Sequence, residues 1–179
     1  ETVIGDNTVI REYVTISKGT VDKLKTVIGK NCLLMAYVHV AHDCIIGNNV
    51  IIANSTQLAG HITIDDWVII EGMVGTQQFV HIGAHSFIAG ASLVRKNVPP
   101  YVKAAREPLA YIGINSVGLK RRGYTADDVS TIENIYKQIY ILNKNVSEGM
   151  SKVASSVADG KLKSEIMDFI NSSEKGVIR

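Results

Sequence analysis

Residues 46–64 read IGNNVIIANSTQLAGHITI, and branched aliphatic residues return in this stretch at every sixth position. Ile46, Ile52, Leu58 and Ile64 mark the period, and a small or β-branched residue follows each of them four places later. A helical period of 3.6 cannot produce this pattern, and a simple alternating strand would not keep a six-residue phase. The stretch therefore predicts short strands separated by a turn that recurs every six residues.

The same phase extends over most of the first hundred residues. Its aliphatic positions are Ile4, Ile10, Ile16, Ile28, Leu34, Val40, Ile46, Ile52, Leu58, Ile64, Ile70, Ile82, Ile88 and Val94. Its small positions are Thr8, Val14, Thr20, Cys32, Val38, Cys44, Val50, Thr56, Ile62, Val68, Val74, Ser86, Ser92 and Val98. With both positions pointing inward and three strands to a coil, the pattern predicts a prism of parallel strands in which residues one coil apart stack.

The corners and the exceptions carry further information. Glycine, alanine or aspartate follows many of the aliphatic residues, as in Ile28-Gly29, and we expect these residues to relieve the tight corners. Asp22 breaks the aliphatic rule inside the charged run Val21–Lys25, which predicts a loop that leaves the coil. Thr76 is the other exception, a small polar residue at an inward position.

The hexad pattern stops at Val98-Pro99-Pro100, where the prolines are expected to end strand pairing. Farther on, Thr125 is an N-cap residue, and apolar residues at helical spacing predict a helix from about Ala126 to Leu142. Shorter helices are expected over 147–157 and 161–170, covering the open end of the prism or packing on a neighbouring subunit. The predicted organisation is a β-helix over 1–100, a transitional segment over 101–124 and a helical domain over 125–179. Because Ile4 already lies in the repeat, we expect further coils to precede it.

Composition excludes several classes of function. The 179 residues include 19 basic and 17 acidic ones, a balance that is not expected of a nucleic-acid-binding protein. No segment approaches the roughly 20 apolar residues that span a bilayer. The chain shows neither a secretory signal nor a disulfide pattern, so a cytoplasmic location is expected.

Three of the five histidines are predicted to meet at one edge of the prism. His39 and His42 lie in one coil, and His61 follows His42 by one coil plus one position. Asp43 directly follows His42, and a carboxylate beside an imidazole fixes its tautomer and stabilises its protonated form. His42, paired with Asp43, is therefore a candidate general base.

The sequence offers no matching protein nucleophile. Cys32 and Cys44 fall on inward positions and are interpreted as core residues, so a bound hydroxyl is the expected nucleophile. The corner at Gly60 could present an unblocked N–H to an oxyanion. The alternative is that His39, His42 and His61 hold zinc, with water as a fourth ligand. Acyl transfer is favoured, because a hydration enzyme has no use for Gln77, Gln78 or the basic run 120–122.

That basic run allows two interpretations. Arg121 and Arg122 lie side by side near the junction of the prism and the helical tail. They could clamp a diphosphate, since guanidinium groups pair well with phosphate oxygens. They could equally be a solvated charged turn, and the residues alone do not decide between these.

Several motifs together resemble the bacterial UDP-N-acetylglucosamine O-acyltransferases. They are the hexad array, the string LMAYVHVAHDC over 34–44, LAGH over 58–61, VPPY over 98–101 and GLKRRG over 118–123. The resemblance runs almost end to end. It implies a mainly β fold, a left-handed parallel β-helix of hexapeptide repeats with a C-terminal α-helical tail. It also implies a homotrimer with active sites between subunits, and transfer of an (R)-3-hydroxyacyl chain from acyl carrier protein to the sugar 3-hydroxyl, the first step of lipid A biosynthesis.

The resemblance also implies roles for individual residues. His42 would be the general base, Asp43 its orienting partner and Gly60 the oxyanion donor, with no cofactor and no metal. The remaining matched positions would bind substrate, with His39, His61 and Gln78 at the acyl and sugar pocket and Asn115, Arg121 and Arg122 at the nucleotide. Gln77 and Pro108 stand where the family often has histidines, so those contacts are not transferred.

Gly90 falls where the family sets acyl length, and a glycine there leaves the groove open. We therefore expect a chain of about fourteen carbons or more, because a bulky side chain would exclude methylenes that each contribute ~0.8 kcal/mol. Two other activities on this fold stay open at this point. They are the N-acyltransferase of the later lipid A step and a zinc-dependent carbonic anhydrase.

Overall fold

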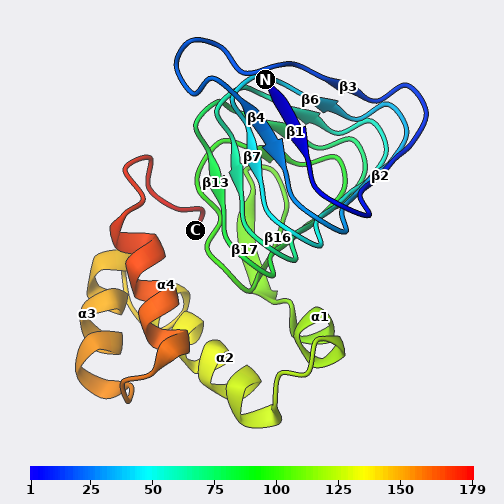
Figure 1. Ribbon diagram of the computed structural model, residues 1–179. Helices are drawn as coiled ribbons and strands as arrows, with labels where there is room; N and C mark the ends of the chain where they lie inside the picture. The colour runs from blue at the N-terminus through cyan, green and yellow to red at the C-terminus, as the bar shows by residue number, and fades with distance from the viewer.

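The computed structural model describes residues 1–179 as a parallel β-solenoid with helices at one end (Figure 1). The coils carry three faces. The first face consists of β1 (Thr2–Ile4), β4 (Thr26–Ile28), β7 (Ile45–Ile46), β10 (Thr63–Ile64) and β13 (His81–Ile82). The second face starts with β2 (Val9–Ile10), β5 (Leu33–Leu34), β8 (Ile51–Ile52), β11 (Ile69–Ile70) and β14 (Phe87–Ile88). The third consists of β3 (Thr15–Ile16), β6 (His39–Val40), β9 (Gln57–Leu58), β12 (Gly75–Thr76) and β15 (Leu93–Val94).

The strand register confirms the predicted stacking. Ile28, Ile46, Ile64 and Ile82 follow one another along the first face in parallel pairs. These side chains are at most 1% exposed, as are Leu34, Ile52 and Ile70 on the second face. Such a column removes apolar surface from water at about 25 cal/mol per Å², so the inward aliphatic residues build the core.

The first coil is longer than the others because it contains the predicted loop. Thr2 pairs with Thr26 and Ile16 with Val40, whereas later coils pair residues eighteen apart, as in Ile46 with Ile64. The extra residues lie between β3 and β4, and the loop projects from the coil near the N-terminus (Figure 1). One detail of the prediction is wrong: Thr20 is not an inward residue. It lies exposed where the chain leaves the coil, and the fully buried Thr26 takes the inward place.

The prediction that glycines relieve the tight corners is wrong. The left-handed residue of each corner is the third after the aliphatic one, and it is almost never glycine: Asn7, Tyr13, Asn31, Tyr37, Asp43, Asn49, Ser55, His61, Trp67, Met73, Phe79, His85 and Ala91. Such a conformation costs an ordinary residue about 1–2 kcal/mol, which the stacked coils offset. The glycines meet a different need, close approach. A Cβ on Gly29 would lie 2.4 Å from the carbonyl oxygen of Gly47 in the next coil.

The prediction that Pro99 and Pro100 end strand pairing is wrong. β16 (Val102–Ala105) pairs in parallel with β14, and β17 (Ala110–Ile114) pairs antiparallel with β16. The prolines lie just before β16, where the missing N–H groups are not needed by the ladder. The segment predicted as transitional therefore lengthens the second face by two strands.

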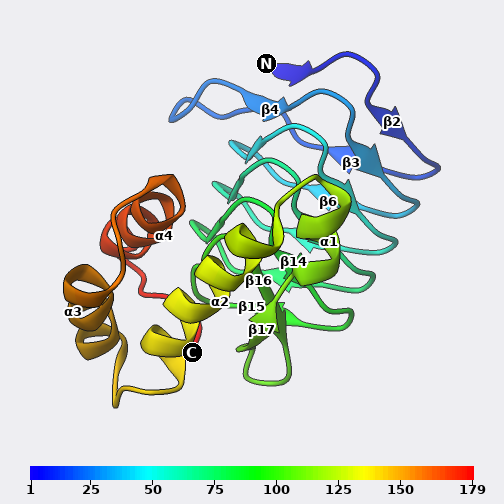
Figure 2. The ribbon, with the colours of Figure 1, turned by 90° about the horizontal axis from the view of Figure 1, so that it is seen from below.

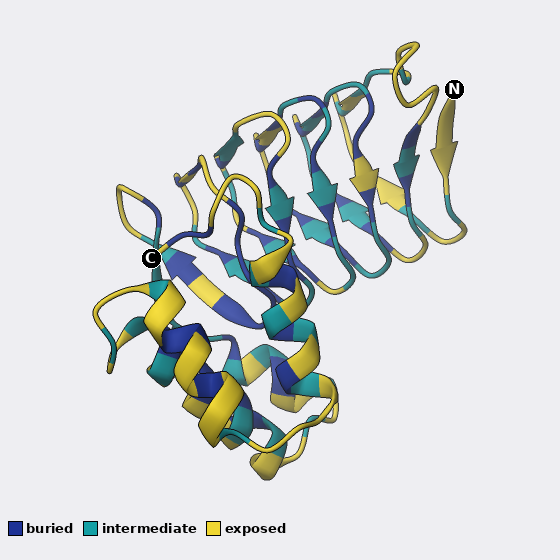
Figure 3. Ribbon diagram, turned by 90° about the vertical axis from the view of Figure 1, so that its left-hand side faces the viewer, coloured by how far each residue is buried: buried dark blue, intermediate teal, exposed yellow.

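The helical tail forms as predicted. After α1 (Ser116–Arg121) come α2 (Ala126–Tyr140), α3 (Val146–Ser156) and α4 (Lys161–Asn171). A capping box between Thr125 and Asp128 begins α2. The hydroxyl of Tyr136 on α2 donates to the carbonyl of Pro100 at 2.6 Å, so α2 covers the end of the solenoid (Figure 2). Helix α2 contacts β17 at that end, and α3 and α4 pack on α2, while β1 at the opposite end is exposed (Figure 3).

Candidate active site

The predicted base lies at the corner between the third and first faces, which we call the histidine corner (residues 41–44, 59–62 and 77–80). The hexad register stacks equivalent residues of successive coils here. His42, Gly60 and Gln78 occupy the second corner position, and Asp43, His61 and Phe79 the left-handed one. The rings of His42 and His61 lie 5.1 Å apart at 87°, and the ring of Phe79 stacks on His61 at 4.6 Å. The predicted proximity of His42 and His61 is confirmed.

His42 and Asp43 form a hydrogen-bonded pair in which the carboxylate is buried and the imidazole is partly exposed. Nδ1 of His42 lies 2.9 Å from Oδ2 of Asp43, and the His42 side chain is 36% exposed while that of Asp43 is fully buried. The N–H of Thr20 donates to Oδ1 of Asp43 at 2.8 Å, and its hydroxyl donates to Oδ2 at 2.6 Å. The carboxylate is therefore held on one side by Thr20 and presented on the other to His42.

These contacts keep Asp43 ionised. Burial alone would raise its pKa, but the hydrogen bonds from Thr20 and His42 and the proximity of His61 outweigh it and lower the pKa to about 2. Because an ionised carboxylate only accepts hydrogen bonds, Nδ1 of His42 must be the donor. Nε2 of His42 then carries a lone pair that is free to take a proton.

His61 completes the cluster from the next coil. Its Nε2 lies 3.7 Å from Oδ2 of Asp43, and its Nδ1 lies 3.4 Å from Oδ2 of Asp22 on the loop. The side chain is only 13% exposed, and Nδ1 has no hydrogen bond. His61 therefore lies between two carboxylates, with Nε2 toward Asp43 and Nδ1 toward Asp22.

Gly60 lies directly against the His42 ring. A Cβ at this position would be 2.7 Å from Cε1 and 2.8 Å from Nε2 of His42, so only glycine leaves the ring where it is. Gly60 is buried, and its N–H donates no hydrogen bond within the chain. The same corner position in other coils, such as Gly72, also has an N–H without a partner in the chain, but the N–H of Gly60 lies beside the His42 ring and could donate to an oxyanion formed near Nε2.

The thiols are not candidates for a nucleophile. Cys32 and Cys44 are free and buried, as predicted. Burial raises the pKa of both, that of Cys44 to about 11, so thiolate is scarce at neutral pH.

His39 does not join the cluster. It lies on β6, within the third face, and its Nδ1 shares a hydrogen bond of 2.7 Å with the hydroxyl of Thr15. The potential metal-ligand atoms that come within 4.8 Å of one another belong instead to His42, Asp43 and His61. This set differs from the three histidines considered for zinc, because Asp43 takes the place of His39. Both oxygens of Asp43 also accept hydrogen bonds from Thr20.

The basic pair lies at a different corner, between the first and second faces, which we call the arginine corner (residues 65–68 and 83–86 with α1). The guanidinium of Arg122 lies over the ring of Trp67 at 5.2 Å and 3.4 Å from Nδ1 of His85. Arg121 is exposed. Asn115 caps α1 through Gly118, and it also donates to the carbonyl of His85 at 2.9 Å.

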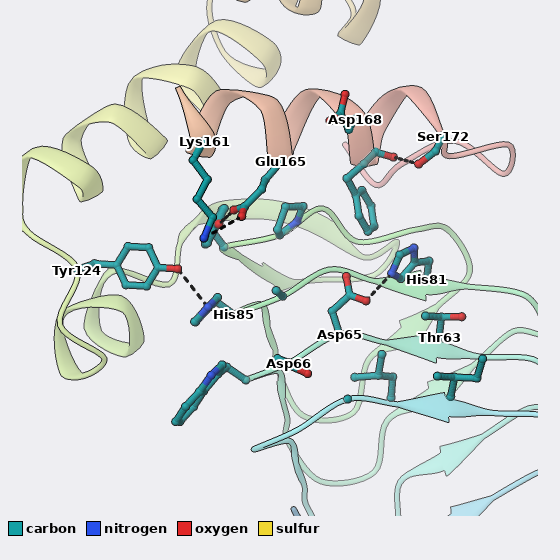
Figure 4. Close-up of a pocket in the computed structure, with 18 residues that line it drawn as sticks. Thr63, Asp65, Asp66, His81, His85, Tyr124, Lys161, Glu165, Asp168 and Ser172 are labelled. Carbon is teal, nitrogen blue, oxygen red and sulfur yellow. Dashed lines mark hydrogen bonds and ion pairs between the residues drawn. The ribbon is translucent and has the colours of Figure 1, made fainter. Parts of the chain in front are cut away.

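A cavity of about 800 Å³ lies beside this corner, between the first face and α4. Figure 4 shows Tyr124 directed at His85 and Asp65 paired with His81 along its wall. His42, Asp43 and Gly60 do not line it. The proposed base is therefore at the open histidine corner and not in this cavity.

Comparison with known proteins decides the family. The model for "Udp N-acetylglucosamine O-acyltransferase; Domain 2" matches residues 97–178, and that for bacterial transferase hexapeptide repeats matches residues 25–60. A Thiobacillus denitrificans protein named acyl-(acyl-carrier-protein)–UDP-N-acetylglucosamine O-acyltransferase is 42% identical over 98% of this chain and 69% of its own. A Burkholderia mallei protein of the same name is 42% identical over 99% of this chain and 70% of its own. The chain belongs to the UDP-N-acetylglucosamine O-acyltransferase family.

A solved structure of the family supports the fold as well. The UDP-N-acetylglucosamine acyltransferase of Francisella novicida matches with a TM-score of 0.94 and 40% identity, over 99% of this chain and 66% of that one. The chain thus spans about two thirds of the length of these acyltransferases. The predicted parallel β-helix of hexapeptide repeats with a helical tail is confirmed.

The other predicted site residues of this acyltransferase lie at separate places. Gln78 is exposed at the histidine corner, one coil beyond Gly60. Gly90 is exposed at the third kind of corner, between β14 and β15, where its N–H donates to Glu71 at 2.9 Å. The roles of His39, Gln78, Gly90, Asn115, Arg121 and Arg122 stay predictions.

Sequence reasoning missed three residues of the site. Thr20 and Asp22 reach it from the loop, and the hydroxyl of Thr26 accepts the N–H of Asp43 at 2.9 Å. The only available signal was that the charged loop interrupts the coil immediately before the one that carries His42. The direction in which a loop folds back is not encoded in a six-residue phase.

His85 makes the stability of the fold depend on pH. Burial and the charge of Arg122 lower its pKa from 6.5 to about 4. Below pH 6.5 the unfolded chain binds a proton that the folded chain refuses until about pH 4, so stability falls as the pH is lowered through that window. We expect the melting temperature to drop less steeply between pH 7 and 4.5 in His85→Asn, which suits the left-handed corner, than in the parent protein. Equal slopes in differential scanning fluorimetry would contradict this.

Proposed function

We propose that this chain transfers an (R)-3-hydroxyacyl group from acyl carrier protein to the 3-hydroxyl of UDP-N-acetylglucosamine, the first step of lipid A biosynthesis. The observation that carries the proposal is the pairing of His42 with Asp43 at 2.9 Å, with the free N–H of Gly60 beside the ring, in a member of this family. A base and an oxyanion donor side by side are what transfer to a hydroxyl requires.

The reaction follows from this geometry. Nε2 of His42 takes the proton of the sugar 3-hydroxyl as the oxygen attacks the thioester carbonyl of the donor. The carbonyl oxygen becomes an oxyanion that accepts the N–H of Gly60. When the intermediate collapses, the carbon–sulfur bond breaks, and the thiol of the carrier leaves with the proton from His42. Asp43 stabilises the imidazolium between these two steps.

The acyltransferase is proposed to act as a homotrimer. His42 and Arg122 lie at different corners of the prism, so one chain does not bring its base and its basic pair together. A second copy packed against the first face could supply Arg121 and Arg122 to a sugar nucleotide bound at the histidine corner. Arginine forks suit a diphosphate, which supports the nucleotide role of this pair.

The location is proposed to be cytoplasmic, where acyl carrier protein and nucleotide sugars are found. None of the four helices combines the length and the apolar character that crossing a bilayer requires.

A direct assay tests the proposal. The protein is incubated with UDP-N-acetylglucosamine and a series of 3-hydroxyacyl carrier proteins, and the products are resolved by mass spectrometry. We expect one acyl group on the sugar 3-hydroxyl. Acylation of an amino sugar alone would favour the N-acyltransferase of the later step, and no transfer to either acceptor would contradict the proposal.

The same series tests the role of Gly90. A Cβ there would lie 3.2 Å from the carbonyl oxygen of Gly72, so a side chain must extend outward past Glu71. We expect Gly90→Met to shift the preferred donor towards shorter acyl chains, with about a fourfold change in relative kcat/KM for each excluded methylene. A chain-length profile identical to that of the parent protein would contradict the proposed role.

A further inference from the structure

The loop between β3 and β4 reaches the histidine corner from the coil before it. It is the only place where a coil of the solenoid is lengthened within strands β1 to β15. Thr20 lies at its start and Asp22 near its tip, and both approach the cluster around His42. The insertion therefore adds side chains to a corner that the repeat alone would leave bare.

Thr20 donates two hydrogen bonds to the carboxylate of Asp43. Its N–H reaches Oδ1 at 2.8 Å and its hydroxyl reaches Oδ2 at 2.6 Å, so both carboxylate oxygens are fixed by one residue. The N–H of Asp43 is fixed in turn by Thr26 at 2.9 Å. With its backbone and its carboxylate both held, Asp43 cannot rotate away from His42.

This arrangement sets the state of His42. Oδ2 of Asp43 accepts from Thr20 and from Nδ1 of His42 at 2.9 Å, so the proton of the imidazole is kept on Nδ1. Nε2 then faces Gly60 with its lone pair. If the carboxylate turned, His42 could adopt the other tautomer and would lose its capacity as a base.

The fold does not need the hydroxyl of Thr20. The residue is exposed, lies outside every strand and contributes nothing to the inward columns. Its hydroxyl donates only to Asp43 and accepts one long contact of 3.3 Å from the N–H of Asp22, while its carbonyl accepts the N–H of Leu24 at 2.8 Å within the loop. A role in the chemistry accounts for this double contact better than a role in packing.

We infer that Thr20 is a positioning residue for acyl transfer. It holds Asp43 so that His42 keeps its proton on Nδ1 and leaves the lone pair of Nε2 free to accept a proton. The inference rests on the proposed function. It deepens that function by assigning the loop a part in it.

The test compares three variants of the full chain. Thr20→Val removes the hydroxyl and keeps the shape and the N–H, Thr20→Ser keeps both donors, and Thr8→Val is the matched control. The hydroxyl of Thr8 bonds only main-chain groups, those of Gly29 and Cys32. Hydrogen bonds to charged groups are worth about 1.5–3 kcal/mol, so we expect Thr20→Val to lower kcat about tenfold to a hundredfold, with KM for UDP-N-acetylglucosamine nearly unchanged.

A spectroscopic readout separates positioning from folding. In ¹⁵N-histidine NMR spectra, His42 should show the Nδ1-protonated tautomer in the parent protein, Thr20→Ser and Thr8→Val, and a mixture of tautomers in Thr20→Val. Full kcat and an unchanged tautomer in Thr20→Val would overturn the inference, as would equal losses in Thr20→Val and Thr20→Ser. Asp43→Asn is assayed in parallel: if it keeps full activity, the proposed use of the His42–Asp43 pair fails, independently of Thr20.

Discussion

Replacing His42 with alanine is expected to lower the rate of acyl transfer by about 10²- to 10⁴-fold, the contribution typical of a positioned general base. The substitution removes Nε2, the atom that faces Gly60, and leaves Asp43 bonded to Thr20. Because Asp43 keeps these two donors and its carboxylate remains paired, we expect the fold to survive. The measurement is the initial rate with saturating donor and acceptor, alongside the melting temperature.

The matched control is another histidine–aspartate pair. Nε2 of His81 lies 2.9 Å from Oδ1 of Asp65, the same separation as in the candidate site, but in the wall of the cavity under α4. His81→Gln should therefore retain most of the activity. Comparable losses in His81→Gln and His42→Ala would show that the effect is general, and full activity in His42→Ala would remove the proposed base.

Replacing Gly60 with alanine is expected to lower the rate by about 10²- to 10³-fold. The new Cβ would meet the His42 ring at 2.7 Å, so either the ring or the corner must move. Both the base and the oxyanion donor would be displaced, and loss of one oxyanion donor alone costs about that factor. Single-turnover rates should fall, while binding of UDP-N-acetylglucosamine changes little.

Gly72 offers the control for this substitution. It occupies the same place in its hexad as Gly60, but a Cβ there would meet only the carbonyl oxygen of Asn54 at 3.2 Å. We expect Gly72→Ala to fold and to remain active. An active Gly60→Ala protein with an unmoved His42 ring would contradict the proposed roles of both residues.

The histidine corner and the arginine corner have the same backbone turn but different side-chain surroundings, and the repeat explains only the turn. Both use the same backbone turn, with His61 and His85 in the left-handed conformation at φ 60° and 61°. At the histidine corner the ring of His61 meets a carboxylate from its own stack, whereas at the arginine corner the ring of His85 meets Arg122, the residue that follows α1. Different neighbours thus give two identical turns different chemistry.

Most of the fold could be predicted from the sequence, because a hexad admits few arrangements. The inward columns through Ile28, Ile46 and Ile64, the burial of Cys32 and Cys44 and the helix beginning after Thr125 follow from spacing or capping alone. The pairing of β16 with β14 did not, since two prolines suggested an end to the ladder. Proline forbids a donor at its own position but says nothing about the residues that follow.

Of the candidate site, the sequence determined what periodicity and adjacency can fix. One coil plus one position brings His42 to His61, and direct succession places Asp43 beside His42. The same register places Gly60 one coil beyond His42, against its ring. The tertiary structure alone decided the rest: the two hydrogen bonds from Thr20 to Asp43 and the pairing of His39 with Thr15 instead of with the cluster. These depend on the path of a non-repeating loop and on side-chain rotamers, which are settled by local contacts in three dimensions and leave no period in the sequence.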